Sequence, residues 1–171
     1  MGHTATLTIA VLCNLALTFS QIVYSEELPV PKTDVLLTIS GALAHPNAGD
    51  EVHLDLAALE SLPATEFTTV TPWHDQPLLF TGVRVSTLFE AIGTDSTAFM
   101  AIGLDDYRFT VTDLDFDKYP VIIAYRQNGA LIPIRDLGPL RIIMPFSDYP
   151  ELKTPINESR SVWQLVALEL Q

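Results

Sequence analysis

The residues with the most distinctive chemistry in this chain are a single thiol and a short acidic run. Cys13 is the only cysteine among the 171 residues. Aspartates alternate through residues 113–117, as the first ligands of an EF-hand calcium loop do. The sixth position of that loop, which needs glycine, is Lys118 here, and the twelfth, which needs a bidentate glutamate, is Ala124. We therefore interpret the run as a solvated acidic edge and predict no metal ligand from it.

Other residue types that commonly carry catalysis form no motif. His45, His53 and His74 are scattered, and no spacing places two of them on one face of an element. Neither Ser147 nor Ser159 lies in a nucleophile elbow, and no glycine-rich phosphate loop or Cys/His metal spacing occurs. Local motifs therefore predict no catalytic residue.

Residues 1–25 have the pattern of a secretory signal peptide. No charged residue occurs from Thr4 to Ser25, the middle of the segment is apolar, and Val23 and Ser25 stand at −3 and −1 of a cleavage point. We predict cleavage after Ser25, a periplasmic or secreted location, and a mature chain without Cys13. An uncleaved membrane anchor is the alternative, because the uncharged stretch is long enough to span a bilayer.

The charge balance restricts the partners of the protein. All 21 acidic and all 9 basic residues follow Ser25, and the formal net charge is −12. Such a surface repels nucleic acid and anionic membranes, so we expect neither as a partner. Residues 26–171 have the length of one domain and show no repeat or linker. Without a disulfide, this predicted domain depends on packing for its stability.

Short elements, punctuated by 12 prolines, are predicted in the first part of this domain. They are a strand over 35–39, a loop over 44–50, a helix over 55–61 capped by Asp55, and an extended segment over 67–71. A second helix is capped by Ser86 or Thr87 and ends before Gly93.

Strands dominate the second part. They are predicted over 98–104, 107–111, 121–125, 131–134, 140–144 and 162–170. Asn128 and Gly129 form a hairpin turn between two of them. Because strands do not alternate with long helices, a doubly wound parallel sheet is disfavoured. The predicted fold class is α+β, a β-rich single domain of mixed sheets with short helices.

Several segments between Trp73 and Pro145 occur in a characteristic order. They are Thr71-Pro72-Trp73, Phe80-Thr81-Gly82-Val83, Asp105-Asp106-Tyr107, the apolar run over 121–125 before Asn128-Gly129, and Leu137-Gly138-Pro139-Leu140-Arg141. In this order they resemble the molybdopterin-binding oxidoreductase domain, the sulfite-oxidase-like family. The resemblance covers about residues 35–170 and implies that family's fold. It also implies the family's cofactor, molybdopterin, and its chemistry, which is oxygen-atom transfer or reduction at a molybdenum held by a pterin dithiolene and one cysteine thiolate.

The resemblance ends at the metal ligand. The family's cysteine lies a few residues before the tryptophan and glycine segment, where this chain has residues 65–71, which contain hydroxyls and no thiol. A threonine oxygen is a hard and normally protonated donor, and so a poor substitute for a soft thiolate. Beyond the arginine strand, Asp148 and Glu151 would repel a pyrophosphate. We therefore expect no bound cofactor and no molybdenum catalysis.

The cleft that holds the pterin in this family is the candidate binding site. We predict that some of Trp73, Tyr107, Arg126 and Arg141 line it and bind a small anionic or pterin-like ligand, or a segment of a partner. A buried Arg141 needs an anion, a carboxylate or carbonyl oxygens around it, so an internal ion pair is the structural alternative. For Trp73 the structural alternative is a core or lid aromatic.

The predicted function is an exported ligand-binding or partner-binding module. One alternative is a genuine molybdopterin-dependent oxidoreductase whose metal coordination is thiol-free or completed by a partner subunit. Another is an accessory or sensory subunit that docks on an envelope or membrane protein. Dispersal of the arginines over separate faces would weigh against a pterin site. The arginines concerned are Arg84, Arg108, Arg126, Arg135 and Arg141.

Overall fold

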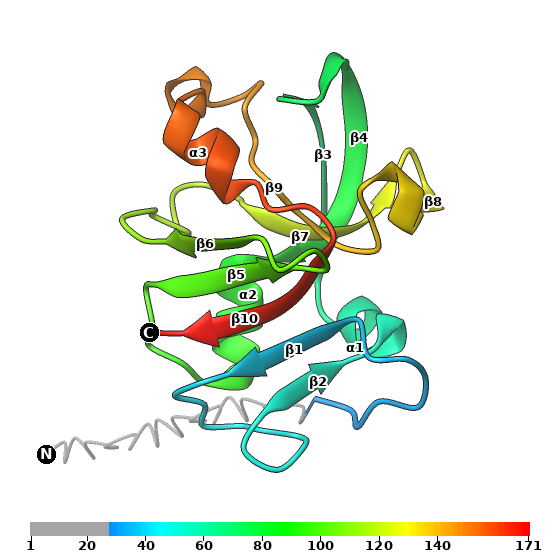
Figure 1. Ribbon diagram of the computed structural model, residues 1–171, viewed down its shortest axis with the longest axis vertical. Coiled ribbons are helices and arrows are strands. Elements are labelled where there is room, and N and C mark those ends of the chain that lie inside the picture. Colours follow the sequence, from blue (N-terminus) through cyan, green and yellow to red (C-terminus); the bar gives the residue numbers. More distant parts are fainter. Residues whose placement is uncertain (1–27) are drawn as a thin grey trace, which may run out of the picture.

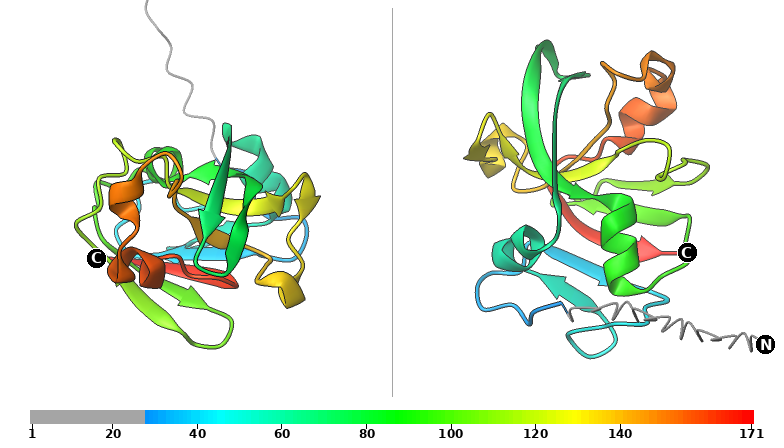
Figure 2. Two further views of the ribbon diagram at one scale, coloured as in Figure 1. Left: turned by 90° about the horizontal axis from the view of Figure 1, so that it is seen from above. Right: turned by 180° about the vertical axis from the view of Figure 1, so that it is seen from behind.

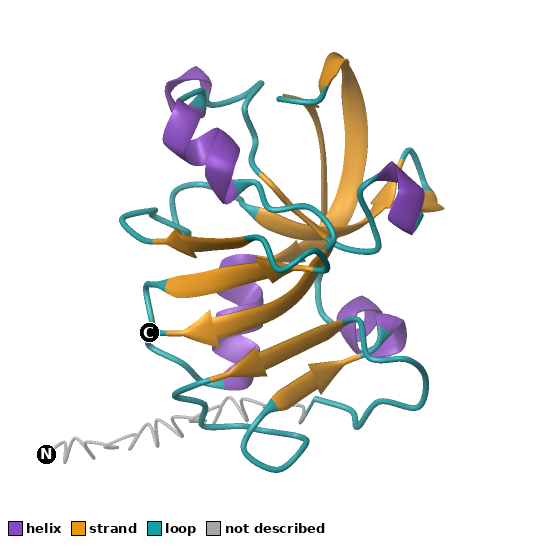
Figure 3. Ribbon diagram, in the orientation of Figure 1, coloured by secondary structure: helices purple, strands orange, loops and turns teal. Residues whose placement is uncertain are grey.

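The structure, a computed structural model, describes residues 28–171, except for the side chain of Asp75, so the predicted signal peptide lies outside the described residues. Its strands form two sheets (Figures 1 and 3). The first sheet has the order β2-β1-β10-β5-β6. Strands β1 and β10 pair in parallel, and the other neighbours are antiparallel. These strands are β1 (Leu37–Ser40), β2 (Val52–Leu54), β5 (Phe99–Gly103), β6 (Arg108–Val111) and β10 (Leu165–Leu170).

The second sheet is antiparallel and has the order β3-β4-β7-β8, with β9 also paired to β7. Strands β3 and β4 form a long hairpin that rises from the body of the molecule (Figure 1). The five strands are β3 (Ala64–Thr71), β4 (His74–Arg84), β7 (Ile122–Gln127), β8 (Ala130–Leu131) and β9 (Arg141–Ile143). Two mixed or antiparallel sheets with few short helices confirm the predicted α+β class.

The main core joins both sheets. Helix α2 (Val85–Ile92) lies behind the first sheet in Figure 1, and its side chains Leu88 and Ile92 are fully buried with those of β1 and β5. A smaller apolar cluster around Phe80 lies in the second sheet. Within residues 28–171, no helix is both long enough and apolar enough to cross a membrane.

Helix α1 (Leu56–Ser61) begins at Asp55, as predicted. The Asp55 carboxylate accepts hydrogen bonds from the backbone N–H of Ala58 at 2.9 Å, from that of Lys32 at 2.9 Å, and from the N–H and hydroxyl of Thr33, each at 3.1 Å. These donors lower the pKa of Asp55 from 3.8 to about 2. Asp55 thereby joins the segment before β1 to the start of α1.

Helix α2 ends at Gly93, as predicted, and the φ of 64° at this residue lies in the left-handed region that favours glycine. Its beginning differs from the prediction. The chain passes directly from β4 into the helix at Val85, so the hydroxyl residues 86–87 lie inside the helix and the predicted cap is wrong. The N–H of Val85 donates to Val121 O at 3.0 Å, which gives the first helical donor an acceptor without a side-chain cap.

Strand β4 and helix α3 (Pro155–Arg160) are absent from the predicted elements. In α3 the Thr154 side chain caps the helix, accepting from the N–H of Asn157 at 3.3 Å. The strand predicted over 131–134 ends after Leu131 and is followed by the 3-10 turn η1 (Ile134–Asp136). Pro133 has no N–H to donate to a strand ladder, which accounts for this ending. The strand predicted to begin at residue 162 begins at 165. A further 3-10 turn is η2 (Pro150–Leu152).

The predicted turn at Asn128-Gly129 joins β7 to β8. Both residues have positive φ, 50° and 80°, as the favoured two-residue hairpin turns require. The Asn128 side chain also accepts from Leu79 N–H at 3.1 Å, which attaches the turn to β4.

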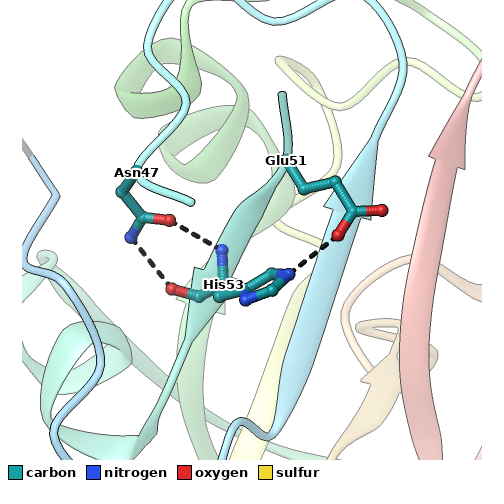
Figure 4. A network of polar contacts seen from close by, with 3 residues as sticks. All are labelled: Asn47, Glu51 and His53. Carbon is teal, nitrogen blue, oxygen red and sulfur yellow. Dashed lines mark hydrogen bonds and ion pairs between the residues drawn. The ribbon is translucent and has the colours of Figure 1, made fainter. Parts of the chain in front are cut away.

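The loop predicted over residues 44–50 is held to β2 by polar contacts (Figure 4). The Asn47 amide accepts from the backbone N–H of His53 at 2.8 Å and donates to its carbonyl at 2.9 Å. The His53 ring lies 2.8 Å from the Glu51 carboxylate. These contacts fix the end of the molecule opposite the β3–β4 hairpin (Figure 1).

Candidate functional site

A cleft lies between the β3–β4 hairpin and α3, which rise on opposite sides of the upper end of the molecule in Figure 1 and are seen from above in Figure 2. It contains cavities of about 440 Å³ and about 260 Å³, both lined by Pro72 and Glu158. We call these adjoining cavities the hairpin cleft. Further lining residues are Trp73, Tyr107, Pro155, Ser159, Ser161, Val162 and Trp163 in the larger cavity, and Val70, Thr71, His74, Phe146 and Lys153 in the smaller one.

Three aromatic side chains line the larger cavity. Trp73 lies in the turn between β3 and β4, Tyr107 precedes β6, and Trp163 precedes β10. Trp73 is 40% exposed and Tyr107 is 41% exposed. The structure therefore brings together two of the four predicted site residues. Trp163 was not predicted as a site residue, although the chain has only two tryptophans and such a rare residue type is a signal.

The turn before β6 holds Tyr107 in place. The Asp105 side chain accepts from Tyr107 N–H at 3.2 Å, and Asp106 has a φ of 61°. The Tyr107 ring stacks on Phe109, with centroids 6.5 Å apart, and its hydroxyl donates to Ser159 O at 3.4 Å. One side of the ring is thus supported by the protein, while the residue still lines the cavity.

Arg141, the third predicted site residue, lies under Trp73 and is only 1% exposed. Its guanidinium carbon is 5.4 Å from the ring centroid of Trp73 and 5.4 Å from that of Phe80. One guanidinium nitrogen donates to the Gln127 amide oxygen at 3.2 Å, whereas Nε and Nη2 have no hydrogen-bond partner. Burial lowers the pKa of Arg141 from 12.5 to about 10.

An internal ion pair was the structural alternative for Arg141, and the structure shows a different environment. Among the described residues, no carboxylate pairs with this guanidinium. Two aromatic rings face it instead, and each cation–π contact contributes about 0.5–2 kcal/mol. The rings offer no acceptor for its N–H groups in the plane of the guanidinium, so this buried cation retains hydrogen-bonding capacity for a further anion.

His74 and Thr71 form a polar pair at the base of the hairpin turn. The Thr71 hydroxyl lies 3.0 Å from His74 Nδ1. Burial lowers the pKa of His74, and the positive charge of Arg141 lowers it further. The imidazole is therefore neutral at neutral pH. The smaller cavity combines this titratable ring with the side chains of Lys153 and Glu158.

Arg126, the fourth predicted site residue, does not line the hairpin cleft. Its guanidinium pairs with Glu60 at 2.7 Å and donates to Gly129 O at 3.3 Å. The other arginines considered in the sequence analysis also have their own local acceptors. Arg84 donates to the carbonyls of Phe116 and Asp117, Arg108 pairs with Asp106 and Glu169, and Arg135 pairs with Asp136. Of this set, Arg141 is the arginine whose guanidinium contacts Trp73, a residue that lines the hairpin cleft.

The side chains in the segment that would hold a molybdenum ligand do not fit that metal. The Thr69 hydroxyl donates to Val70 O at 3.2 Å and accepts from Ser147 N–H at 3.0 Å, and the Thr71 hydroxyl is engaged with His74. These are hard, hydrogen-bonded oxygens, whereas the family resemblance implies a soft thiolate as the metal ligand. Within residues 28–171, no group of three or more His, Cys, Asp or Glu side chains is arranged to hold a metal ion.

Comparisons with known proteins show the fold. No family model matches the chain, and no curated protein matches it. The chain is similar to the crystal structure of the sulfane dehydrogenase SoxCD from Paracoccus pantotrophus, with a TM-score of 0.59 and 15% sequence identity. The match covers 84% of this chain but only 40% of the SoxCD chain. The architecture is thus consistent with a sulfite-oxidase-like fold.

Proposed function

We propose that this protein is an exported binding domain, that the hairpin cleft is its ligand site, and that it works without molybdenum catalysis. The observation that carries the proposal is Arg141, a buried guanidinium with two unpartnered nitrogens against a wall of the cleft. A buried donor without an acceptor costs about 1–3 kcal/mol, and more when it is charged. An anionic ligand group would satisfy these donors.

The ligand reaches Arg141 past the edge of the Trp73 side chain, which contacts the guanidinium and also lines the larger cavity. Because Trp73 belongs to the turn of a projecting hairpin and is 40% exposed, its ring can move without disturbing the core. A carboxylate or phosphate group then accepts from Nε and Nη2 of Arg141. Each such charge-assisted hydrogen bond contributes about 1.5–3 kcal/mol.

The first experiment measures molybdenum and pterin in protein purified from the periplasm of a host that makes the cofactor. The proposal predicts neither above background, and an intact mass that begins at Glu26. Near-stoichiometric molybdenum would overturn the binding-domain proposal in favour of an oxidoreductase with thiol-free or partner-completed coordination. Retention of residues 1–25 in the mature protein would contradict the predicted cleavage.

A second experiment tests the cleft directly by titrating the protein with inorganic phosphate. The two tryptophans, Trp73 and Trp163, both line the larger cavity, so intrinsic fluorescence reports on the site without labelling. We expect a saturable change that weakens about tenfold or more in Arg141→Met, because the anion loses its donors. The matched control is Arg126→Met, which removes an arginine outside the cleft and leaves the response unchanged. Equal responses of the two variants would contradict the assignment.

A protein partner would give a different result. If the fluorescence does not respond to phosphate but the wild-type protein is retained by one envelope protein and the Trp73→Ala variant is not, the cleft holds a partner segment instead of a small anion. A stable monomer in size-exclusion chromatography of an envelope extract supports the small-ligand proposal.

A further inference from the structure

The two cavities of the hairpin cleft differ in their lining side chains. The larger one is lined by the aromatic rings of Trp73, Tyr107 and Trp163, and Glu158 is the charged side chain among its described lining residues. The smaller one also contains His74 and Lys153. The cavities meet at Pro72 and Glu158. Aromatic faces and a carboxylate suit a cation, whereas basic side chains suit an anion.

We propose that the hairpin cleft binds a zwitterion that carries a quaternary methylammonium group. The methylammonium group lies among the three aromatic rings of the larger cavity, and the anionic group lies toward Arg141 and the smaller cavity. The anionic half of this assignment rests on the proposed function. The aromatic half stands on its own observations.

The aromatic half follows from the electrostatics of ring faces. The face of an aromatic ring is negative, so a cation within about 6 Å of its centroid is attracted, and a quaternary ammonium gains most because it has little water to lose. The neighbours of the rings hold them ready for this contact. Phe109 supports one side of Tyr107, Arg141 supports one side of Trp73, and the Tyr107 hydroxyl is attached to Ser159 O. The cavity of about 440 Å³ has room for a trimethylammonium group with its attached chain.

Charge explains why a zwitterion is favoured over a simple cation. Arg141 lies 5.4 Å from the ring centroid of Trp73, so a lone cation in the cage would be opposed by a buried positive charge nearby. A ligand that also carries an anionic group turns this repulsion into an attraction. The net charge of −12 adds a long-range attraction for the cationic end.

The test compares ligands that differ by one group, using tryptophan fluorescence and calorimetry on the mature protein. The ligands are phosphocholine, choline, 3,3-dimethyl-1-butanol, which is the uncharged carbon analogue of choline, and inorganic phosphate. We expect phosphocholine to bind about tenfold more tightly than choline and than phosphate, and the uncharged analogue to bind about tenfold more weakly than choline. Binding of the uncharged analogue as tightly as choline would overturn the proposal, and so would an absence of any response to phosphocholine.

Variants separate the two halves of the site. Tyr107→Leu should weaken choline and phosphocholine about tenfold and leave phosphate unchanged, because it removes a ring face and keeps an apolar side chain. Glu158→Gln should weaken choline severalfold. Its matched control is Glu90→Gln, which removes the same charge from a separate cavity beside α2 and should have no effect. Arg141→Met should abolish the advantage of phosphocholine over choline.

These outcomes distinguish this proposal from the proposed function. A response to phosphate without any preference for phosphocholine would overturn the methylammonium assignment and leave the anion site intact. Binding of choline that is weakened by Tyr107→Leu, with no effect of Arg141→Met, would support the aromatic cage and overturn the anion site. Sedimentation with phosphatidylcholine vesicles, but not with phosphatidylglycerol vesicles, would identify the ligand as a lipid headgroup. Binding of soluble phosphocholine without vesicle binding would identify a free ligand, and either result supports the proposal.

Discussion

Two buried charges on different elements of the molecule have contrasting environments. Asp55, at the start of α1, is 2% exposed and accepts four hydrogen bonds from nearby donors. Arg141, at the hairpin cleft, is 1% exposed and makes one hydrogen bond, while two of its nitrogens have no partner. The pKa of Asp55 is lowered to about 2 and that of Arg141 to about 10.

The two pKa shifts have the same direction and opposite meanings. For a carboxyl group, a lowered pKa means that the protein stabilises the charged form. For a guanidinium, a lowered pKa means that burial penalises the charged form. Asp55 is therefore satisfied within the chain and belongs to the scaffold. Arg141 is stabilised only in part by the chain, which is expected of a group that completes its contacts with a ligand.

The largest expected effect is on the satisfied charge. Asp55→Ala should lower the melting temperature by several degrees, because the backbone donors of Lys32, Thr33 and Ala58 lose their acceptor together. Thermal unfolding measured at pH 7 checks this. The exposed Asp34 provides the control, since Asp34→Ala should leave the melting temperature nearly unchanged. Equal effects at the two positions would show that the network around Asp55 does not stabilise the fold.

Removal of the unsatisfied charge at Arg141 is expected to stabilise the protein. Arg141→Met should raise the free energy of unfolding by about 1–4 kcal/mol, because an apolar side chain of similar length replaces a buried cation with unfilled hydrogen bonds. Arg160→Met is the matched control. Arg160 is also buried, but it donates to Asn157 and to Thr112 O, so its replacement should lower the free energy of unfolding by about 1–3 kcal/mol. Urea unfolding measures both values. Destabilisation by Arg141→Met would mean that the aromatic rings compensate the buried charge fully.

Lowering the pH should reveal how much the ionised Asp55 carboxylate contributes to the free energy of unfolding. Because its pKa is lower in the folded state than in the unfolded state, the stability that it contributes is complete above pH 3.8 and is lost as the pH falls toward 2. The difference in unfolding free energy between the wild type and Asp55→Asn should therefore shrink over this range. A difference that stays constant from pH 5 to about pH 2 would assign the stabilisation to hydrogen bonding that does not depend on charge.

The sequence could predict features that depend on neighbouring residues, but not contacts between residues far apart in the chain. The cap at Asp55, the end of α2 at Gly93 and the turn at Asn128-Gly129 were predicted correctly because each depends on residues adjacent in the chain. The bonds from Lys32 and Thr33 to Asp55 cross more than twenty positions and carry no local pattern. Local signals gave a wrong prediction at the start of α2, where the carbonyl of Val121, just before β7, accepts from the first helical N–H in place of a side-chain cap.

The candidate site was predictable only in part. The resemblance identified Trp73, Tyr107 and Arg141, and the structure places the first two in one cavity and the third against Trp73. The salt bridge of Arg126 with Glu60 spans 66 positions, so no local pattern indicates that this arginine has its own carboxylate. The structure also explains why one residue of the motifs, Gly82, is a glycine. A side chain at Gly82 would lie 2.2 Å from Ile123 O, so the close approach of β4 and β7 requires glycine.

The smallest expected effect is on the pH dependence of stability, through His74 in the smaller cavity. Its pKa is lowered in the folded state, so the folded protein binds fewer protons than the unfolded chain just below pH 6.5, and stability should fall as the pH drops through this range. Replacing the imidazole in His74→Gln should remove this slope. Thermal unfolding of both proteins from pH 7.5 to 5 measures it, and identical slopes would contradict the assignment.

An anion bound in the hairpin cleft should stabilise the protein more as the pH falls, which is opposite in sign to the effect of His74 alone. Its negative charge opposes that of Arg141 and favours protonation of His74, so anion binding should strengthen as the pH falls. Sulfate is the suitable probe because its own charge is constant from pH 7.5 to 5, with chloride at equal ionic strength as the control. The rise in melting temperature caused by sulfate should grow toward acid in the wild type and stay constant in His74→Gln. A growing rise in both proteins would place the responsible proton on a group other than His74.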